Sequence, residues 1–285
     1  MAHPAIRKGA TAVVTGGASG IGLAAATSFA RAGMNVVIAD LGLERIDAAA
    51  ASIGGSVEGA AERFAGFETD VSDRAALEGL RDDVYARFGG TDLLMLNAGI
   101  QPGSSLFGDP AAWHRVLDVN LWGAVNGAQV FGPGMIARGR DGAIIVSGSK
   151  QGITTPPGDP AYNVSKAGVK AFTEALAHEL RETPGCRIAA HLLIPGFVFT
   201  ELTRQGRSEK PASAWTPEQT VAFMLESLER GDFYILCPDN DVPRPLDEKR
   251  IAWAAGDIIE NRPPLSRWHK DYGEAFAAYV AGTDS

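Results

Sequence analysis

A tyrosine and a lysine four residues apart could carry out proton transfer in this sequence. Tyr162 and Lys166 open a long amphipathic segment, and residues at this spacing share one face of a helix. A nearby ammonium favours the phenolate, which lowers the pKa of the tyrosine towards a range useful for proton transfer. Ser149 lies upstream of the pair, where its hydroxyl can donate to a carbonyl or alcohol oxygen. The alternatives are ordinary helix surface for the pair and a turn serine that binds its own backbone.

A glycine-rich turn spans Thr15–Gly22, after a strand-like run and before a segment with helical periodicity. Glycines let backbone N–H groups approach a pyrophosphate at a helix N-terminus, where unpaired donors and the helix dipole favour an anion. The alternative is a tight turn without a ligand. The turn therefore predicts a dinucleotide site that includes Gly16, Ser19, Gly20, Ile21 and Gly22.

Asp40 ends the second strand-like run, about 20 residues after the glycine-rich turn, where a carboxylate can accept hydrogen bonds from adenosine ribose hydroxyls. The same carboxylate repels a 2′-phosphate, and neither Gly17 nor Leu41 offers a basic replacement. Asp40 therefore predicts NAD (NADH) as the cofactor in preference to NADP. The alternative is a helix N-cap for the segment that begins near Leu43.

Short apolar runs alternate with longer amphipathic segments as far as residue 193. The runs predicted as strands are Thr11–Thr15, Asn35–Ala39, Asp92–Leu96, Ala143–Ser147 and Arg187–Leu193, with further ones at Arg63–Thr69 and Phe233–Leu236. The segments predicted as helices are Gly20–Ala32, Leu43–Ser52, Asp73–Phe88, Ala111–Arg138, Ala161–Glu182 and Asp247–Glu260. This alternation is typical of a parallel sheet covered on both faces. We therefore predict an α/β fold with a doubly wound parallel sheet of about seven strands.

Composition excludes several classes of function. The chain has 285 residues, with 26 Lys and Arg against 34 Asp and Glu and a net charge of -8. So acidic a surface repels phosphate backbones and anionic lipid, which argues against nucleic-acid and membrane partners. No apolar stretch suits a transmembrane helix or a signal peptide, and the two cysteines fit a reducing compartment, so we expect a cytoplasmic protein. The scattered histidines predict no metal site.

The composition changes after residue 193 without supplying a second core. The segment 203–216 mixes Gly, Ser, Lys and Pro, which predicts a mobile loop that closes over the substrate. Residues 237–285 read as a C-terminal extension of one domain that comprises residues 1–285. Within that extension, the tail at residues 262–272 suits a subunit contact or a cap over a neighbouring site, and packing against its own sheet is the alternative.

Further motifs follow in order along the chain: Asp70-Val71, Asn97-Ala-Gly99, Val119-Asn-Leu-x-Gly123 and Pro195-Gly-x-Val-x-Thr200. Together with the glycine-rich turn, Ser149 and Tyr162-x-x-x-Lys166, they make the sequence similar to the short-chain dehydrogenase/reductase family over roughly residues 9–200. The resemblance implies a Rossmann fold and hydride transfer between a nicotinamide and an alcohol or carbonyl carbon. Two positions depart from the family pattern, because Leu96 replaces the usual asparagine before Asn97 and Gly148 replaces the usual serine before Ser149.

The resemblance also implies a role for each matched residue. Tyr162 would be the general acid/base, Ser149 would orient the reacting oxygen, and Lys166 would bind the nicotinamide ribose. Asn120 would hold a water in a proton relay behind Lys166. The other matched residues would contact the cofactor: Asp70 and Val71 at the adenine, Asn97, Ala98 and Gly99 at the adenosine ribose, Val198 and Thr200 at the nicotinamide and phosphates, with Pro195 and Gly196 shaping that turn. The alternatives are a plain strand-end turn at Asn97–Gly99 and a helix kink at Asn120.

Substrate contacts are expected from residues that follow the matched motifs. These are Gln101, Ser149, Gln151, Ile153, Phe197 and Phe199. Their aromatic and aliphatic character favours a bulky, partly apolar secondary alcohol or ketone, aromatic or alicyclic, unless these side chains only pack the core. The sequence thus predicts an NAD-dependent alcohol dehydrogenase or carbonyl reductase, and the alternative is a catalytically silent NAD(H)-binding sensor or scaffold. By resemblance, the segments 111–138 and 161–182 would form the interface of a homodimer or homotetramer.

Overall fold

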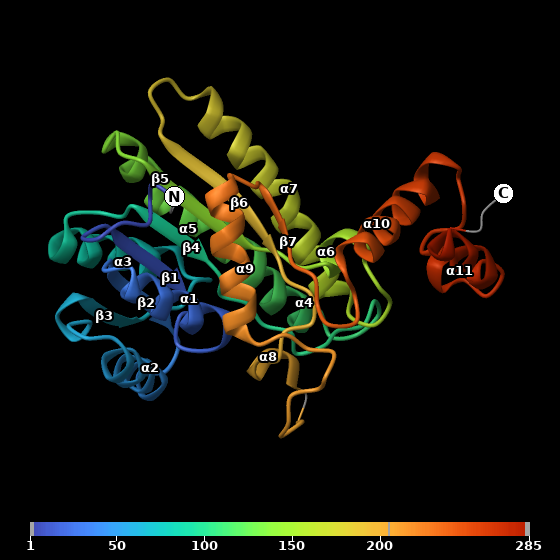
Figure 1. Ribbon diagram of the computed structural model, residues 1–285, viewed down its shortest axis with the longest axis horizontal. Coiled ribbons are helices and arrows are strands. Elements are labelled where there is room, and N and C mark those ends of the chain that lie inside the picture. The colour runs from blue at the N-terminus through green and yellow to red at the C-terminus, as the bar shows by residue number, and fades with distance from the viewer. Residues whose placement is uncertain (1–2, 205, 283–285) are drawn as a thin grey trace.

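The computed structural model describes residues 3–204 and 206–282, and a parallel sheet lies at its centre (Figure 1). The described strands form one 7-stranded sheet in the order β3-β2-β1-β4-β5-β6-β7. Their bounds are β1 (Thr11–Thr15), β2 (Asn35–Asp40), β3 (Phe64–Glu68), β4 (Leu93–Leu96), β5 (Gly142–Ser147), β6 (Ile188–Ile194) and β7 (Tyr234–Leu236). The strand order reverses between β1 and β4, and doubly wound sheets bind ligands at such a point. The predicted α/β fold is confirmed.

Helices cover both faces of the sheet and explain why its central strands are buried and mostly apolar. On one face lie α1 (Gly20–Arg31), α2 (Leu43–Ser56) and α9 (Pro217–Arg230), whose buried side chains share a core with β1 and β2. On the other face lie α3 (Arg74–Phe88), α5 (Gly123–Ala137) and α7 (Pro160–Glu182), which form a second core. Because both faces are covered, all five residues of β1 are buried.

The predicted helix at 111–138 is wrong as one regular helix. The structure has α4 (Pro110–Leu117), a π-helical turn η2 (Asp118–Trp122) and then α5. A π-turn adds one residue to the helical repeat and is frequent at functional sites. Gly123, which follows the turn, packs against Val71 so closely that a Cβ there would lie 2.8 Å from Val71 Cγ2. Asn120 lies within the π-turn.

Several elements were not predicted. The longest is α9, which packs on the sheet although no helix was expected between residues 217 and 230. The others are a 3₁₀ turn η1 (Ala61–Arg63), the helix α6 (Gln151–Thr154) after the catalytic candidate Ser149, α8 (Glu201–Arg204), a 3₁₀ turn η3 (Ser266–Trp268) and the helix α11 (Gly273–Ala281). The segment 203–216 contains the end of α8, and its residue 205 lies outside the described residues. Backbone hydrogen bonds at Trp215 hold the end of the segment. The amide of Trp215 donates to the Phe197 carbonyl oxygen at 2.9 Å, and the amide of Phe199 donates to the Trp215 carbonyl oxygen at 2.9 Å.

The C-terminal extension, described as far as residue 282, leaves the sheet and forms a projecting arm (Figure 1). The arm comprises α10 (Arg244–Ile259), a 3₁₀ turn η3 (Ser266–Trp268) and α11. Trp253 is its centre: the indole N–H donates to Ser266 Oγ at 2.7 Å, and the Arg262 guanidinium lies 4.0 Å from the centre of the indole ring. The tail at 262–272 thus packs on α10, whereas one of the two predictions was packing against the sheet. Among the described residues, no helix combines the length and apolarity that crossing a membrane requires.

Candidate functional site

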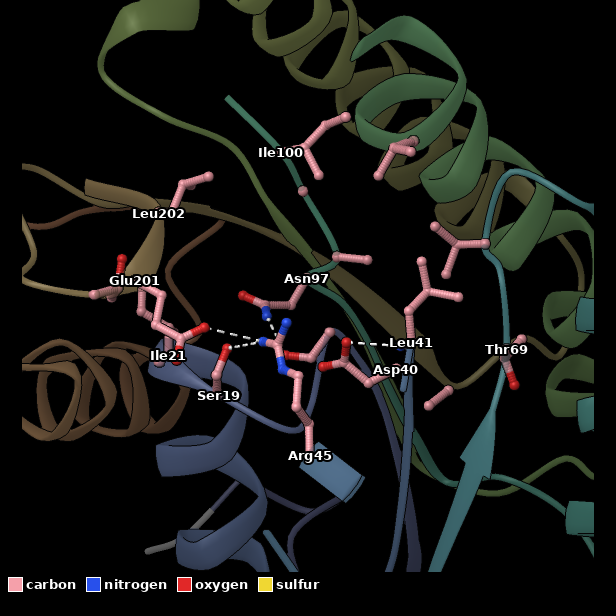
Figure 2. A pocket seen from close by; sticks show the side chains of 18 of the residues that line it. Ser19, Ile21, Asp40, Leu41, Arg45, Thr69, Asn97, Ile100, Glu201 and Leu202 are labelled. Carbon is pink, nitrogen blue, oxygen red and sulfur yellow. Dashed lines mark hydrogen bonds and ion pairs between the residues drawn. The ribbon is translucent and has the colours of Figure 1, made fainter. Parts of the chain in front are cut away.

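Two adjoining cavities open at the carboxyl ends of the strands. The first, which we call the groove, has a volume of about 260 Å³ and lies over β1, β2 and β4 (Figure 2). The second, which we call the reaction pocket, has a volume of about 400 Å³ and lies over β5 and β6. Both include Ile21, Asn97, Gly99, Thr200 and Leu202, so one long molecule can occupy them together.

The glycine-rich turn lies in the floor of the groove. Gly16 has a φ of +63°, and a Cβ there would lie 2.8 Å from Ala98 Cα. At Gly22 a Cβ would lie 2.0 Å from the Gly16 carbonyl oxygen, so this glycine supports the turn from behind without lining either cavity. Ser19 is the N-cap of α1 but makes no side-chain capping bond, so the first N–H groups of the helix remain available to an anion.

Asp40 lines the groove at the end of β2, the position that the sequence predicts. One carboxylate oxygen accepts from the amide of Ala18 at 2.9 Å, and the other accepts from the amide of Leu41 at 2.8 Å. Gly42, and not Asp40, is the N-cap of α2. Each carboxylate oxygen keeps further capacity to accept a ribose hydroxyl.

A cation that the sequence analysis missed lies beside this carboxylate. Arg45, from the first turn of α2, extends into the groove, donates to Ser19 Oγ at 3.0 Å and pairs with Glu201 at 3.2 Å (Figure 2). Neither Gly17 nor Leu41 is basic, as the sequence indicates, and the cation comes instead from Arg45, which α2 brings to the groove.

The motif Asn97–Gly99 joins the ends of three strands. The Asn97 amide group donates to the Gly16 carbonyl oxygen at 3.1 Å, and its side-chain oxygen accepts from Ser147 Oγ at 3.0 Å. Ala98 and Gly99 line the groove with Asp70 and Val71. Leu96, the first departure from the family pattern, is accommodated by Gly127 of α5, where a Cβ would lie 2.4 Å from Leu96 Cδ2.

Tyr162, Ser149 and Lys166 line the reaction pocket together, as predicted. Asp159 caps α7 and accepts from the Tyr162 amide at 3.5 Å, which fixes the first turn that presents the phenol. Ser149 hydrogen bonds with the phenol, and its Oγ accepts from the Gln151 amide at 3.1 Å. The departure at Gly148 leaves this arrangement intact, because the Gly148 amide donates to the Leu193 carbonyl oxygen at 2.7 Å.

Burial controls the electrostatics of the pair. It raises the pKa of Tyr162 to about 12, and the hydrogen bond with Ser149 opposes this only in part. It also lowers the pKa of Lys166 to about 8. The predicted lowering of the tyrosine pKa by Lys166 is wrong for this structure, because the ammonium donates to the Ser147 carbonyl oxygen at 2.7 Å and lies 5.7 Å from the centre of the phenol ring.

Asn120 lies in the π-turn and uses its side chain to hold two segments together. Its amide group donates to the Ile100 carbonyl oxygen at 2.9 Å and to Ser165 Oγ at 3.2 Å, and its oxygen accepts from the Ile100 amide at 2.7 Å. Both N–H groups are therefore used, and one acceptor position of the oxygen remains. This geometry fixes the loop after β4 against α7, and the water relay stays a prediction.

The turn after β6 closes the reaction pocket from the other side. Pro195, Gly196, Val198 and Thr200 line it, and Thr200 also lines the groove. Gly196 lets two charged side chains approach the turn, because a Cβ there would lie 2.5 Å from Asp239 Oδ2 and 2.9 Å from Lys150 Nζ and these side chains would have to shift. The Phe197 amide donates to Asp239 Oδ2 at 3.2 Å.

The substrate side of the pocket agrees only in part with the sequence analysis. Gln101, Gln151 and Phe197 line it, whereas Ile153 lines a small separate cavity and Phe199 lines neither. The lining residues that were missed are Lys150, Asp239, Val242 and Arg250. Lys150 could have been noticed because it follows Ser149, but nothing local predicts that residues of the extension return to this pocket.

The groove fits the dinucleotide that the sequence predicts. The glycines leave space that a Cβ would fill, the N-terminus of α1 is uncapped, and a carboxylate lies where a ribose would end. Across the described ranges, no cluster of histidine, cysteine or acidic side chains could hold a metal ion.

Known proteins resemble this chain over most of its length. The profile of the family described as short chain dehydrogenase matches residues 10–211. A 1-deoxy-11-beta-hydroxypentalenate dehydrogenase of Streptomyces exfoliatus is 31% identical over 90% of this chain and 93% of its own. A D-beta-hydroxybutyrate dehydrogenase of Cupriavidus necator is 33% identical over 79% and 85%. The crystal structure of a Burkholderia phymatum short chain dehydrogenase/reductase in complex with NAD superposes with a TM-score of 0.81, at 28% identity over 91% of this chain and 97% of that one.

Proposed function

Because the chain belongs to the short-chain dehydrogenase/reductase family, we propose that it is an NAD-dependent oxidoreductase that interconverts a secondary alcohol and a ketone. The observation that carries this proposal is the meeting of Ser149, Tyr162 and Lys166 in one pocket that continues into the groove. A sensor that had lost catalysis would not need this combination.

The roles of the pocket residues follow from their contacts. When bound, the dinucleotide supplies the acceptor or donor of the hydride. Tyr162 takes the hydroxyl proton of the alcohol in the oxidation and returns it in the reduction, while Ser149 donates to the reacting oxygen and holds it beside the phenol. Lys166, which lines the reaction pocket, binds the ribose hydroxyls. Asn120 keeps α7 and the loop after β4 in register.

The preference for NAD over NADP rests on Asp40. Its carboxylate faces the groove, and the charge of the neighbouring Arg45 is already paired with Glu201. The 2′-phosphate of NADP would therefore be repelled by Asp40, and Arg45 would compensate little of this repulsion because it is paired with Glu201. The NAD found with the Burkholderia relative supports the same choice.

The substrate is a bulky, partly apolar alcohol or ketone that contacts Gln101, Gln151 and Phe197. Two relatives are named for a hydroxypentalenate and a hydroxybutyrate, which are both alcohols. We place the subunit contacts of a homodimer or homotetramer on helices α4, α5 and α7. We place the protein in the cytoplasm.

The test is the absorbance change of the nicotinamide with NAD and a panel of aliphatic, alicyclic and aromatic secondary alcohols. We expect turnover with NAD, and we expect Tyr162→Phe to bind NADH normally while turnover falls by at least ~10²-fold. Near-normal turnover in that variant would remove Tyr162 from the mechanism. NADH binding without turnover of any alcohol would favour the sensor.

A further inference from the structure

One part of the reaction pocket is charged, although the proposed substrate is partly apolar. Lys150, Asp239 and Arg250 line the same pocket as Ser149 and Tyr162. Arg250 belongs to α10 of the C-terminal arm, and Lys150 immediately precedes α6, against which α10 packs. The arm thus contributes a side chain to a pocket that the core of the sheet otherwise builds.

Lys150 is fully neutralised by the two carboxylates around it. Its Nζ lies 2.5 Å from Asp247 Oδ2 and 3.3 Å from Asp239 Oδ2. Asp239 also accepts from the Phe197 amide at 3.2 Å, so it is held by the turn that closes the pocket. Gly196 permits this approach, because any larger residue would meet both charged groups.

Arg250, in contrast, has no directly bound partner. Within residues 3–204 and 206–282 it forms no ion pair, and its Nε is buried without a hydrogen-bond acceptor. The carboxylate of Asp247 acts on it electrostatically, but Asp247 already pairs with Lys150 at 2.5 Å. Arg250 therefore keeps a positive charge that the carboxylates around Lys150 do not bind directly.

An unpaired guanidinium at the wall of a partly enclosed cavity loses hydration without a compensating contact. The group that best compensates it is a carboxylate, because the planar fork of arginine matches both carboxylate oxygens. The pocket volume of about 400 Å³ is within the range of small-molecule sites, and a single ligand there has both Arg250 and the pair Ser149 and Tyr162 among the residues around it.

We propose that the substrate carries a carboxylate separate from its reacting carbon, and that Arg250 binds this carboxylate in the reaction pocket. This inference rests on the proposed function, because it takes Ser149 and Tyr162 as the end at which the alcohol or ketone reacts. The substrate class is then a hydroxy acid or keto acid whose apolar middle section contacts Phe197 and Val242.

The probes are three keto acids of different length, 4-oxopentanoate, 5-oxohexanoate and 4-acetylbenzoate, each beside its uncharged methyl ester. Calorimetric titration into protein saturated with NAD measures binding alone, because the oxidised cofactor cannot reduce a ketone. We expect at least one acid to bind ~10- to 100-fold more tightly than its ester, as a charge-assisted bidentate contact provides. The same acid should be reduced with NADH at a correspondingly higher kcat/KM.

Variants assign the effect to one side chain. Arg250→Gln should remove the advantage of the acid and leave ester binding unchanged, and Arg250→Lys should keep part of it. Arg244→Gln is the matched control, because Arg244 lies on the same helix, points to solvent and pairs with Glu248 at 2.8 Å. Urea unfolding of each variant shows whether the fold is retained.

The outcomes separate this inference from the proposed function. Equal binding of acid and ester in all three pairs, or an advantage that persists in Arg250→Gln, overturns the carboxylate site. Reduction of the esters in that case leaves the proposed function standing. An Arg250-dependent advantage of an acid without reduction of any ketone keeps the site and overturns the function.

Discussion

Replacing Asp40 by asparagine should weaken the discrimination against NADPH. Asp40 accepts one hydrogen bond with each carboxylate oxygen, from Ala18 at 2.9 Å and from Leu41 at 2.8 Å. Asparagine keeps one of these acceptors. Because the Leu41 amide is exposed and can bind water, the side-chain oxygen should turn to Ala18, and the fold should lose about 1 kcal/mol at most. The change is therefore mainly one of charge.

The magnitude follows from Coulomb's law. Two unit charges about 5 Å apart interact by about 3 kcal/mol at an effective dielectric constant near 20. Asp40 is partly exposed and salt screens it, so we take about 2 kcal/mol as the gain for a 2′-phosphate, or ~30-fold in the Kd of NADPH. NADH loses one charged acceptor for its ribose, which costs about 1 kcal/mol or ~5-fold.

Calorimetric titration of NADH and NADPH measures this without any substrate. Asp47→Asn serves as the control, since Asp47 is an exposed acid of α2 that does not line the groove. Glu201→Gln should strengthen NADPH binding by a separate route, because it frees Arg45 from its ion pair. An unchanged Kd for NADPH in Asp40→Asn, or an equal shift in Asp47→Asn, would refute the reasoning. The shift should also shrink at about 0.5 M salt.

Two further predictions concern stability. Burial lowers the pKa of Lys166 to about 8, so between pH 8 and 10 the folded protein binds fewer protons than the unfolded chain. The free energy of unfolding of the wild type should therefore rise over that range relative to that of Lys166→Met. We expect a rise of about 2 kcal/mol in urea unfolding. A gain of the same size in the variant would contradict this. Gly127→Ala should cost about 1–3 kcal/mol, because the new methyl group overlaps Leu96 Cδ2. Leu96→Ala should cost less in the Gly127→Ala background than in wild type, and equal costs would show that the two sites are independent.

The strands and the motifs at their ends were predictable because both are local. The run Thr11–Thr15 is apolar and is followed by glycines, and no distant contact is needed to recognise a strand that turns at a phosphate site. The same holds for Tyr162 and Lys166, whose spacing alone puts them on one face.

Other features were not predictable because distant contacts create them. The π-turn that contains Asn120 lies among such contacts, because Asn120 binds Ile100 and Gly123 packs closely against Val71. Arg45 and Arg250 look like ordinary surface arginines of amphipathic helices, and only the packing of α2 and α10 brings them to the two cavities. The high pKa of Tyr162 depends on how completely the pocket buries it, which spacing does not determine.

Residues that line the reaction pocket come from two parts of the sequence, one inside the family match and one after it. The family match ends at residue 211, whereas Asp239, Val242 and Arg250 lie beyond it. Substitutions in α10 can therefore alter which molecule is accepted while every motif residue stays unchanged. If the reaction pocket binds the substrate as proposed, the motif residues of this chain set the bond that is transformed, and residues beyond the family match contribute to the choice of molecule.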